Sequence, residues 1–522
     1  MPRRQQQAGD ICGIFIHAGA GFHSLQNEKT HLNAVNDAAK VGMAILKNGG
    51  DAVEAVEMAI RLLEDKEITN AGYGSNLTVH GQVECDATLV DHFGRSGAVG
   101  AISQVKNPIA VARLVLDDST KPMSLHRVPP NLLVGAGATD YAADKGIPIL
   151  PPDYLVSTSA RDRWSRWREE LDNATRREAR RGSQSLPSSS TEPPDDWGRS
   201  PTPAPTPLGP TGSPPSPGRP LSLAQMPPIV RPLMASTADV PTLSRPGGGR
   251  DRGHPSSVSP SQSTAVHNSS DGNASYGHPE AASDDSLQWL SSAPKRQKLD
   301  DTFDGPAGEG FRSGNTPQPS LRAPELAHVD NEGEDDIRDT VGAIAIDCFG
   351  RIAAGSSSGG IGMKHKGRCG PAALVGIGSA VVPIDPQDPT QTCVATVTSG
   401  TGEHMATTSA AATAADRIYN SVRKEQGRLV SCNEDEAMLS VIKHDFMAHP
   451  GVSNSPCTGA IGIMAVKKSR DGIYFYFGHN TDSFALASMH SGEKKPVCTM
   501  SRSRGHGSIA QGGRVSRLAK SR

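Results

Sequence analysis

The residue with the clearest chemical potential is Thr340, which opens an apolar segment, TVGAIAID, directly after Asp339 and a polar, acidic approach. A threonine hydroxyl is a poor nucleophile and needs a base. Cleavage between Asp339 and Thr340 would create an α-amine with a pKa of about 7.7–8.0, and this amine could accept the hydroxyl proton at neutral pH. The structural alternative is that Thr340 only opens a core strand, because threonine favours strands.

Other catalytic patterns are absent from the sequence. It contains no P-loop, no GxGxxG after a strand, no HExxH and no GxSxG. Its 17 histidines show no metal-ligand spacing, so we expect neither a metal nor another cofactor. The eight cysteines lie at least 21 residues apart, which is typical of reduced thiols in a cytosolic or nuclear protein rather than of a disulfide scaffold.

The elements that must position Thr340 follow from hydrophobic periodicity and turn residues. The segment from Thr340 and the segment RIAAGSSS form a predicted β-hairpin around Cys348-Phe349-Gly350. Further strands are expected at 11–17, 83–92, 98–105, 457–468, 472–480 and 483–490, and helices at 28–47, after Asp51, from Pro108, at 402–424 and at 433–449. This order suggests two mostly antiparallel sheets stacked between helical layers.

The middle of the chain cannot form a core. Of the 40 prolines, 25 fall between residues 182 and 330, among Ser, Gly, Thr and Asp. Such a composition buries too little apolar surface to offset chain entropy, so we expect a disordered insert over about 182–330. Lys+Arg (53) and Asp+Glu (55) nearly balance, which argues against direct nucleic-acid binding. No run of about 18 apolar residues and no signal peptide is found, so no membrane association is expected.

Seven sequence blocks resemble the type-2 asparaginase branch of the N-terminal nucleophile hydrolases, and within it the threonine aspartases. They are IHAGAGFHS (16–24), TNAGYGSNLTVHGQVECDATLVD (69–91), GAVGAISQVKNPIAVA (97–112), DTVGAIAID (339–347), SSSGGIGMKHKGRCGPAAL (356–374), TSGTGEHM (398–405) and GHNTDSFALASM (478–489). The resemblance implies a four-layer αββα sandwich, interrupted by the insert. It also implies self-cleavage into an α subunit (1–339, globular over about 11–181) and a β subunit (340–522), and a dimer of such processed units.

The resemblance also assigns site residues. Thr340 would be the nucleophile, and Ser358 would hydrogen-bond to it, although Ser358 could simply finish the hairpin. Ser399 and Gly400 would hold the oxyanion; otherwise they form only a glycine-rich turn before a helix. Asn70 would polarise the scissile carbonyl during self-cleavage, with a buried structural asparagine as the alternative.

Arg368 and Pro371 bear on the substrate. Arg368 matches the arginine that grips a substrate carboxylate, a task that suits a guanidinium; a solvated loop arginine is the alternative. Asparaginases carry an aspartate where Pro371 stands, and that aspartate receives the free α-amine of the substrate. Proline cannot hold an ammonium group. The proline at this position, together with Asp339 before the nucleophile, favours a substrate whose Asp lies within a polypeptide chain.

The sequence therefore predicts a self-processing threonine endopeptidase that cleaves protein substrates after Asp. An isoaspartyl peptidase or L-asparaginase on the same fold is one alternative, and a non-catalytic scaffold whose insert binds partners is another. Lys295, Arg296 and Lys298 resemble a nuclear-import signal for an import receptor, and 161–181 is a second basic segment. We expect a nuclear or cytoplasmic location, or both.

Overall fold

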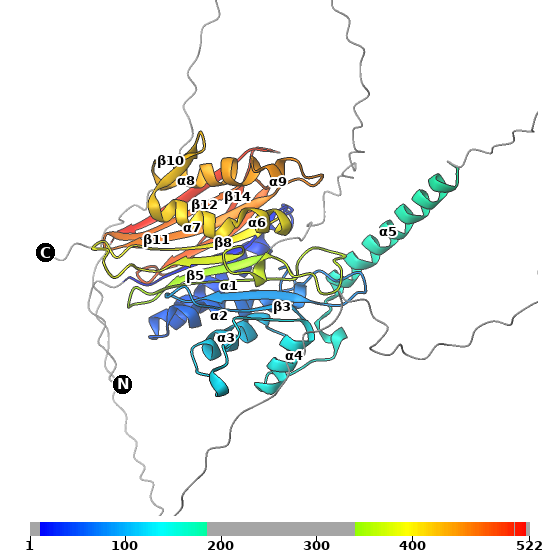
Figure 1. Ribbon diagram of the computed structural model, residues 1–522, viewed down its shortest axis with the longest axis horizontal. Coiled ribbons are helices and arrows are strands. Elements are labelled where there is room, and N and C mark those ends of the chain that lie inside the picture. The colour runs from blue at the N-terminus through cyan, green and yellow to red at the C-terminus, as the bar shows by residue number, and fades with distance from the viewer. Residues whose placement is uncertain (1–10, 185–339, 506, 518–522) are drawn as a thin grey trace, which may run out of the picture. The chain divides into compact units, whose positions relative to one another are not determined.

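The computed structural model describes residues 11–184, 340–505 and 507–517 (Figure 1). Almost all of the predicted insert lies outside these residues. Asp339 and the basic residues Lys295, Arg296 and Lys298 lie outside them as well. The described fold is thus built from two parts of the chain, one before residue 185 and one after residue 339.

Two β-sheets form the two inner layers. The larger sheet has eight strands, in the order β14 (Val497–Arg502), β13 (Ser483–His490), β1 (Gly13–Gly21), β5 (Val341–Ile346), β6 (Ile352–Ser358), β2 (Cys85–Val90), β3 (Ser96–Ile102) and β4 (Leu132–Val134). The smaller has five, in the order β15 (Ala510–Arg517), β12 (Gly472–His479), β11 (Ile461–Ser469), β8 (Cys393–Gly400) and β7 (Ser379–Val382). A separate hairpin pairs β9 (Val422–Glu425) with β10 (Arg428–Ser431). Neighbouring strands are antiparallel except for the parallel pair β3–β4, as the sequence predicted.

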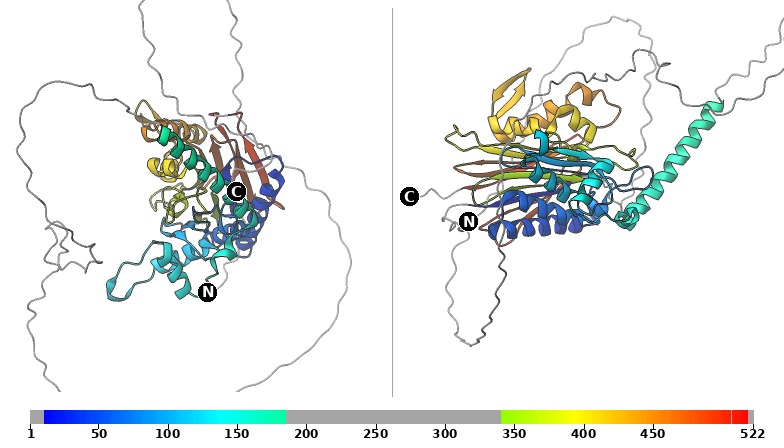
Figure 2. Two further views of the ribbon diagram at one scale, coloured as in Figure 1. Left: turned by 90° about the vertical axis from the view of Figure 1, so that its right-hand side faces the viewer. Right: turned by 60° about the horizontal axis from the view of Figure 1, so that its bottom comes forward.

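Helices form the two outer layers (Figures 1 and 2). The large sheet is covered by α1 (Glu28–Lys47), α2 (Ala52–Glu64) and α3 (Pro108–Ser119), while α4 (Gly135–Asp144) packs beside β3. The small sheet is covered by α7 (Ala410–Asn420) and α8 (Glu434–Ser440), with α6 (Gly402–Thr408), η7 (Val441–Met447) and α9 (Pro450–Ser453) nearby. The predicted αββα sandwich is thereby confirmed.

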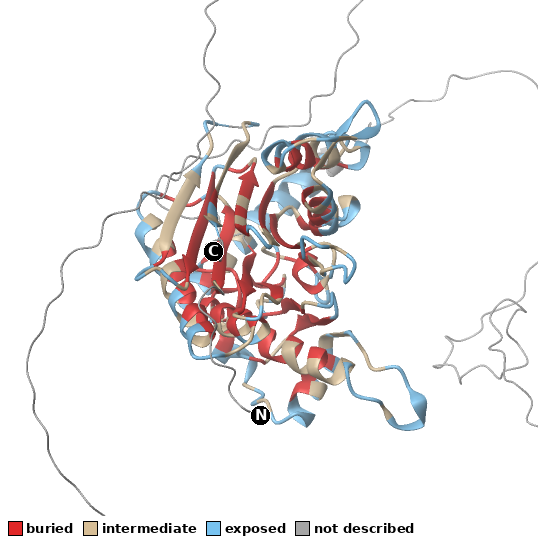
Figure 3. Cartoon of the chain, turned by 90° about the vertical axis from the view of Figure 1, so that its left-hand side faces the viewer, coloured by how far each residue is buried: buried red, intermediate tan, exposed pale blue. Residues whose placement is uncertain are grey.

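Three apolar clusters hold the layers together. The central strands are almost fully buried, whereas β4, β14 and β15 at the sheet edges are only partly buried (Figure 3). One joins α1–α3 to the large sheet and is rich in alanine; another joins α7 and α8 to the small sheet. Between the sheets lie larger side chains, among them Phe15, Ile344, Val397 and Phe475. Because burial of apolar surface is the main stabilising contribution, these clusters fix how the strand ends meet.

One predicted element was wrong. The single helix over 402–424 is two helices, α6 and α7, followed by strand β9. Ser409 separates the helices, with a φ of 49° in the left-handed region. Six further strands were not predicted either: β4, β7, β8, β10, β14 and β15. By contrast, α1 has the predicted bounds, and Asp51 caps α2 by accepting the Glu54 N–H at 2.8 Å, as expected.

Helix α5 (Thr158–Gln184) contains the whole of the predicted basic segment 161–181. Its first turns pack on two loops of the body: Trp164 Nε1 donates to the Thr78 carbonyl at 3.0 Å, and the Trp167 ring fills the space above Gly362. Among the helices of residues 11–184, 340–505 and 507–517, none is both long and apolar enough to cross a bilayer.

Candidate active site

Thr340 lies just before β5, at the place where the two sheets face each other. The residue is buried, with 3% of its surface exposed. Its backbone N–H donates to Ser399 Oγ at 3.2 Å, and the Ala20 N–H donates to the same oxygen at 3.0 Å. Both bonds use the Ser399 hydroxyl oxygen as acceptor, so its proton can still be donated to a third group.

Strand pairing aligns Ser358 with Thr340. In the antiparallel pair β5–β6, Val341 stands opposite Ser357, so the next step of the register sets Thr340 opposite Ser358. Such neighbours have Cβ atoms about 4.5–5.5 Å apart. Ser358 Oγ accepts the Gly360 N–H at 3.0 Å, which fixes the hydroxyl at the end of β6.

Asn70 braces the turn that follows Ser358. Its Nδ2 donates to the Gly360 carbonyl at 2.8 Å, and its backbone carbonyl accepts the Gly359 N–H at 2.8 Å. Its Oδ1 accepts the Asn76 N–H at 2.9 Å. No hydrogen bond joins Asn70 to Thr340 in the part of the chain that the structure describes. The contacts of Asn70 are thus those of a support for the Ser358 turn.

Gly400 has a backbone that only glycine accommodates easily. Its φ is +146°, and a Cβ atom at this position would lie 2.1 Å from the Ala460 carbonyl oxygen. The next residue, Thr401, donates its N–H to the same carbonyl at 2.8 Å. The end of β8 therefore turns sharply at Gly400, directly after Ser399.

The guanidinium of Arg368 packs closely against three glycines. Its Nε and Nη2 both donate to Glu403 Oε1, at 3.0 and 2.7 Å, and its side chain is 15% exposed. A Cβ atom on Gly360, Gly370 or Gly402 would lie within 2.9 Å of a guanidinium nitrogen. A Cβ on Gly402 would also lie 2.8 Å from Pro371 Cδ, so Arg368 and Pro371 border the same glycine at the start of α6.

Lys364 and Asp86 are buried charged residues that the sequence analysis missed. Lys364 Nζ donates to the carbonyls of Glu84 and Gly359, the latter at 2.7 Å. Asp86 accepts the N–H groups of Ala101 at 2.8 Å and Gly370 at 2.7 Å. Burial lowers the pKa of Lys364 and raises that of Asp86, while the opposite charge of each partner counteracts the shift. Both residues brace the loop that joins Ser358 to Arg368.

His17, in β1, was missed too, although a histidine inside an apolar run was a visible signal. The residue is fully buried, and a Cβ on Gly342 would lie 2.3 Å from its Nε2. Burial lowers the pKa of His17 to about 3, against an opposing contribution from the Thr340 backbone. The ring is therefore neutral at pH 7 and lies beside the start of β5.

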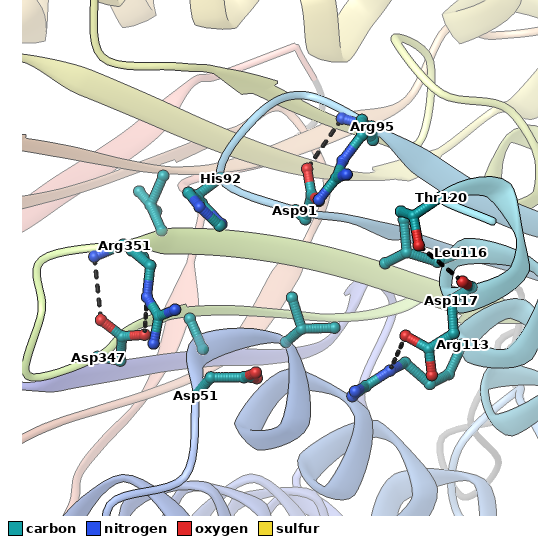
Figure 4. Close-up of a pocket in the computed structure, with 13 residues that line it drawn as sticks. Asp51, Asp91, His92, Arg95, Arg113, Leu116, Asp117, Thr120, Asp347 and Arg351 are labelled. Carbon is teal, nitrogen blue, oxygen red and sulfur yellow. Dashed lines mark hydrogen bonds and ion pairs between the residues drawn. The ribbon is translucent and has the colours of Figure 1, made fainter. Parts of the chain in front are cut away.

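A cavity of about 200 Å³ lies at the other end of the hairpin (Figure 4). Two similar turns, DHFGR and DCFGR, contribute Asp91, Arg95, Asp347 and Arg351 to its lining. Each arginine binds the aspartate of its own turn, at 2.6 Å for Arg95–Asp91 and 2.8 Å for Arg351–Asp347. Strand β5 separates this cavity from Thr340 by roughly 20 Å, so it is no part of the candidate site.

Comparisons of the sequence with known proteins identify the family that it resembles. A family model described as asparaginase matches residues 11–198 and 309–463. The chain is also similar to proteins named isoaspartyl peptidase/L-asparaginase. The protein of Xenopus laevis is 38% identical over 161 residues, that of Danio rerio 37% over 156, and that of Homo sapiens 37% over 160. These alignments cover 31%, 29% and 30% of this chain and 49%, 47% and 49% of the respective relatives.

The chain thus spans about half the length of the curated relatives that it matches. The family model, by contrast, covers well over half of the chain, in two blocks that include Thr340, Ser358, Ser399 and Arg368. Together with the αββα layers, this match shows that the chain belongs to the type-2 asparaginase family of the N-terminal nucleophile hydrolases.

Proposed function

We propose that this protein is a threonine endopeptidase that activates itself by cleavage between Asp339 and Thr340 and then cuts protein substrates after Asp. Thr340 is the nucleophile, and its newly formed α-amine is the base. Support comes from the position of Thr340 between the sheets, where Ser399 contacts its nitrogen and Ser358 lies opposite in the strand register.

The reaction proceeds by acyl transfer. The Thr340 hydroxyl attacks the main-chain carbonyl carbon of the substrate aspartate and passes its proton to the Thr340 amine. The Ser399 hydroxyl and the Gly400 N–H stabilise the negative oxygen of the tetrahedral intermediate. Collapse breaks the peptide bond, and the protonated amine returns its proton to the leaving nitrogen. Water then hydrolyses the ester on Thr340, and the same amine serves as base.

The observation that carries the specificity proposal is that Pro371, which borders the same glycine as Arg368, brings no carboxylate to the site. Proline has no charge with which to hold an ammonium group. Three carboxylates near Arg368 already accept hydrogen bonds: Asp86 from two backbone N–H groups, Glu84 from the Gly367 N–H, and Glu403 Oε1 from the guanidinium. At the position of Pro371 a free α-ammonium group would find no carboxylate partner, and it would lose its hydration on entry. An aspartate within a chain carries no such group.

An isoaspartyl peptidase or L-asparaginase activity is the second candidate, because the similar curated proteins carry that name. The same nucleophile and the same arginine would serve it. The two candidates differ in whether the substrate presents a free α-amine. Assays of an Asp-containing peptide, a β-aspartyl dipeptide and free L-asparagine, side by side on the purified protein, distinguish them.

Self-cleavage is tested first, by intact mass and a denaturing gel of the full chain incubated at pH 7–8. The expected products are fragments 1–339 and 340–522, with threonine at the new N-terminus. Thr340→Ala removes the nucleophile and should stay intact, while the neighbouring Thr401→Ala should still cleave. A folded wild-type protein that remains a single 54.7 kDa chain would refute the proposal.

We further propose that the processed units form a dimer and that Lys295, Arg296 and Lys298 direct the protein to the nucleus. The support for both is the sequence alone: the family resemblance for the first, and a short basic cluster for the second. A reporter fused to residues 285–305, compared with the same fusion carrying alanine at these three positions, tests the import signal.

A further inference from the structure

Glu403 binds one particular edge of the Arg368 guanidinium. Glu403 Oε1 accepts from Nε and from Nη2, which together form the side-on edge of the guanidinium. Burial would raise the pKa of the Glu403 carboxyl, but the hydrogen bond and the charge of Arg368 outweigh it and keep the pKa below its ordinary value. Glu403 is thus ionised at neutral pH, and one edge of Arg368 is occupied in the resting protein.

The other edge of the guanidinium, formed by Nη1 and Nη2, remains available. Nη1 has no hydrogen-bond partner among the residues that the structure describes. A Cβ on Gly360 or Gly370 would lie 2.9 or 2.8 Å from Nη1, and one on Gly402 would lie 2.7 Å from Nη2. The three glycines leave room for the guanidinium, and a side chain at any of them would displace it.

We propose that Glu403 is a positioning residue that sets substrate specificity: it holds the side-on edge of Arg368, so that the end-on edge faces the site and binds the substrate carboxylate. This inference rests on the proposed role of Arg368 as the carboxylate-binding residue. An end-on guanidinium offers two parallel N–H donors, a geometry that matches the two oxygens of a carboxylate. An amide offers one oxygen and two N–H donors of its own, so it matches this edge poorly.

Without Glu403, the arginine keeps its charge but loses the contact that fixes its plane. The side chain would then sample several rotamers, and the two N–H bonds to a carboxylate would no longer be directed. Substrate binding should weaken, while the chemical step at Thr340, which Arg368 does not contact, should change little. Loss of the structural support that Glu403 gives to α6 would lower activity on acidic and amide substrates equally. It would therefore leave the preference for Asp over Asn unchanged.

The test compares Glu403→Ala with Glu403→Gln on the full, processed protein. Glutamine retains an acceptor oxygen at the same reach, whereas alanine does not. Glu436→Ala is the matched control, because Glu436 also lies in the first turn of a seven-residue helix and binds an arginine, Arg423, at 3.3 Å. The substrates are a peptide cut after Asp and its Asn counterpart, with KM and kcat measured separately.

Glu403→Ala should raise KM for the Asp peptide about tenfold with kcat nearly unchanged, and the ratio of kcat/KM between the Asp and Asn peptides should fall by a similar factor. Glu403→Gln should restore most of this ratio, and Glu436→Ala should leave it unchanged. Equal losses on both peptides, a Glu403→Ala variant that behaves like the wild type, or a Glu403→Gln variant as impaired as Glu403→Ala would each overturn the inference.

Failure of the proposed function is recognised separately, as a wild-type protein that cuts no Asp peptide. The role of Glu403 is then measured with a β-aspartyl dipeptide or L-asparagine, whose carboxylate would meet the same guanidinium. Calorimetric titration with N-acetyl-L-aspartate gives the comparison without turnover. Equal affinities of the wild type and Glu403→Ala for this compound, or no binding to the wild type, would overturn the inference.

Discussion

Arg368 is the residue on which substrate choice depends most directly. Losing a charge-assisted pair with a desolvated carboxylate costs about 2–4 kcal/mol, so Arg368→Ala should lower kcat/KM for an Asp peptide by roughly 30- to 1,000-fold. Cleavage of the Asn peptide should change much less. Steady-state kinetics on both peptides check this. If Arg368 only supported its loop, the melting temperature would fall while the preference for Asp over Asn persisted.

Pro371 should determine whether free amino acids are accepted. Pro371→Asp places a carboxylate beside the glycine that Arg368 borders, and this carboxylate could receive an α-ammonium group. The variant should therefore hydrolyse L-asparagine or a β-aspartyl dipeptide at least about tenfold better than the wild type, since an ammonium–carboxylate pair in a partly desolvated site contributes a few kcal/mol. Pro371→Asn supplies similar bulk without the charge and should not gain this activity. Efficient asparagine hydrolysis by the unmodified protein would contradict the argument.

Residues that lie on paired strands were easier to foresee than residues that act through distant contacts. Thr340 and Ser358 belong to one predicted hairpin, so their alignment follows from period-two geometry. Lys364 and Glu403 showed no comparable signal, since their partners, Glu84 and Arg368, are 280 and 35 residues away in sequence. A contact between two single polar residues that are far apart in the sequence produces no periodic sequence pattern.

Among the elements, the contact between α2 and β6 contains a buried acid that makes stability depend on pH. Glu64 is fully buried, and its Oε1 accepts the Ser357 hydroxyl at 2.7 Å and the Ile109 N–H at 3.0 Å. Burial raises the pKa of Glu64 from 4.5 to about 8, although these hydrogen bonds oppose the shift. Between these values the folded protein holds a proton that the unfolded chain has lost, so stability falls as pH rises.

Glu64→Gln keeps the shape and the acceptor but removes this titration. Relative to the wild type, the variant should gain stability between pH 5 and pH 8, by an amount on the order of a few kcal/mol. Urea unfolding of both proteins at the two pH values measures the change. Glu57→Gln, on the same helix but more exposed, should show a smaller dependence. An identical difference between wild type and Glu64→Gln at pH 5 and pH 8 would contradict the assignment.

The elements were predicted well where one signal dominated and poorly where two competed. Helix α1 is bounded by Asn27 and by Gly49-Gly50, and its ends agree with the sequence pattern. The run 402–424 is rich in alanine and is typical of one helix, yet Ser409 adopts the left-handed conformation. From that point α7 packs on β7, β8 and β11, so tertiary packing outweighs local helix propensity. The hydrophobic periodicity of the sequence does not indicate such packing.

For the molecule as a whole, the αββα stacking followed from the order of elements and from the family resemblance, whereas the strand order within each sheet did not. The large sheet mixes strands of both predicted subunits: β1 of the first lies between β13 and β5 of the second. The apolar layer between the sheets also combines Phe15 of the first segment with Ile344, Val397 and Phe475 of the second. After cleavage, the two fragments should therefore stay together as one folded unit.

The same arrangement predicts that the central insert is dispensable for folding. All three apolar clusters are built from residues before 161 and after 340, and the composition of 182–330 offers little to add to them.

Deleting 190–325 leaves 19 residues between Gln184 and Thr340, which can extend about 60 Å. The deletion variant should melt within about 10 °C of the full chain and should still cleave before Thr340. Thermal melting followed by circular dichroism measures the first property, and intact mass measures the second. The deletion also shortens the loop between Gln184 and Thr340. The entropic cost of closing this loop should therefore be slightly smaller, which favours the folded state. A drop of more than about 10 °C would mean that part of 190–325 packs against the sandwich.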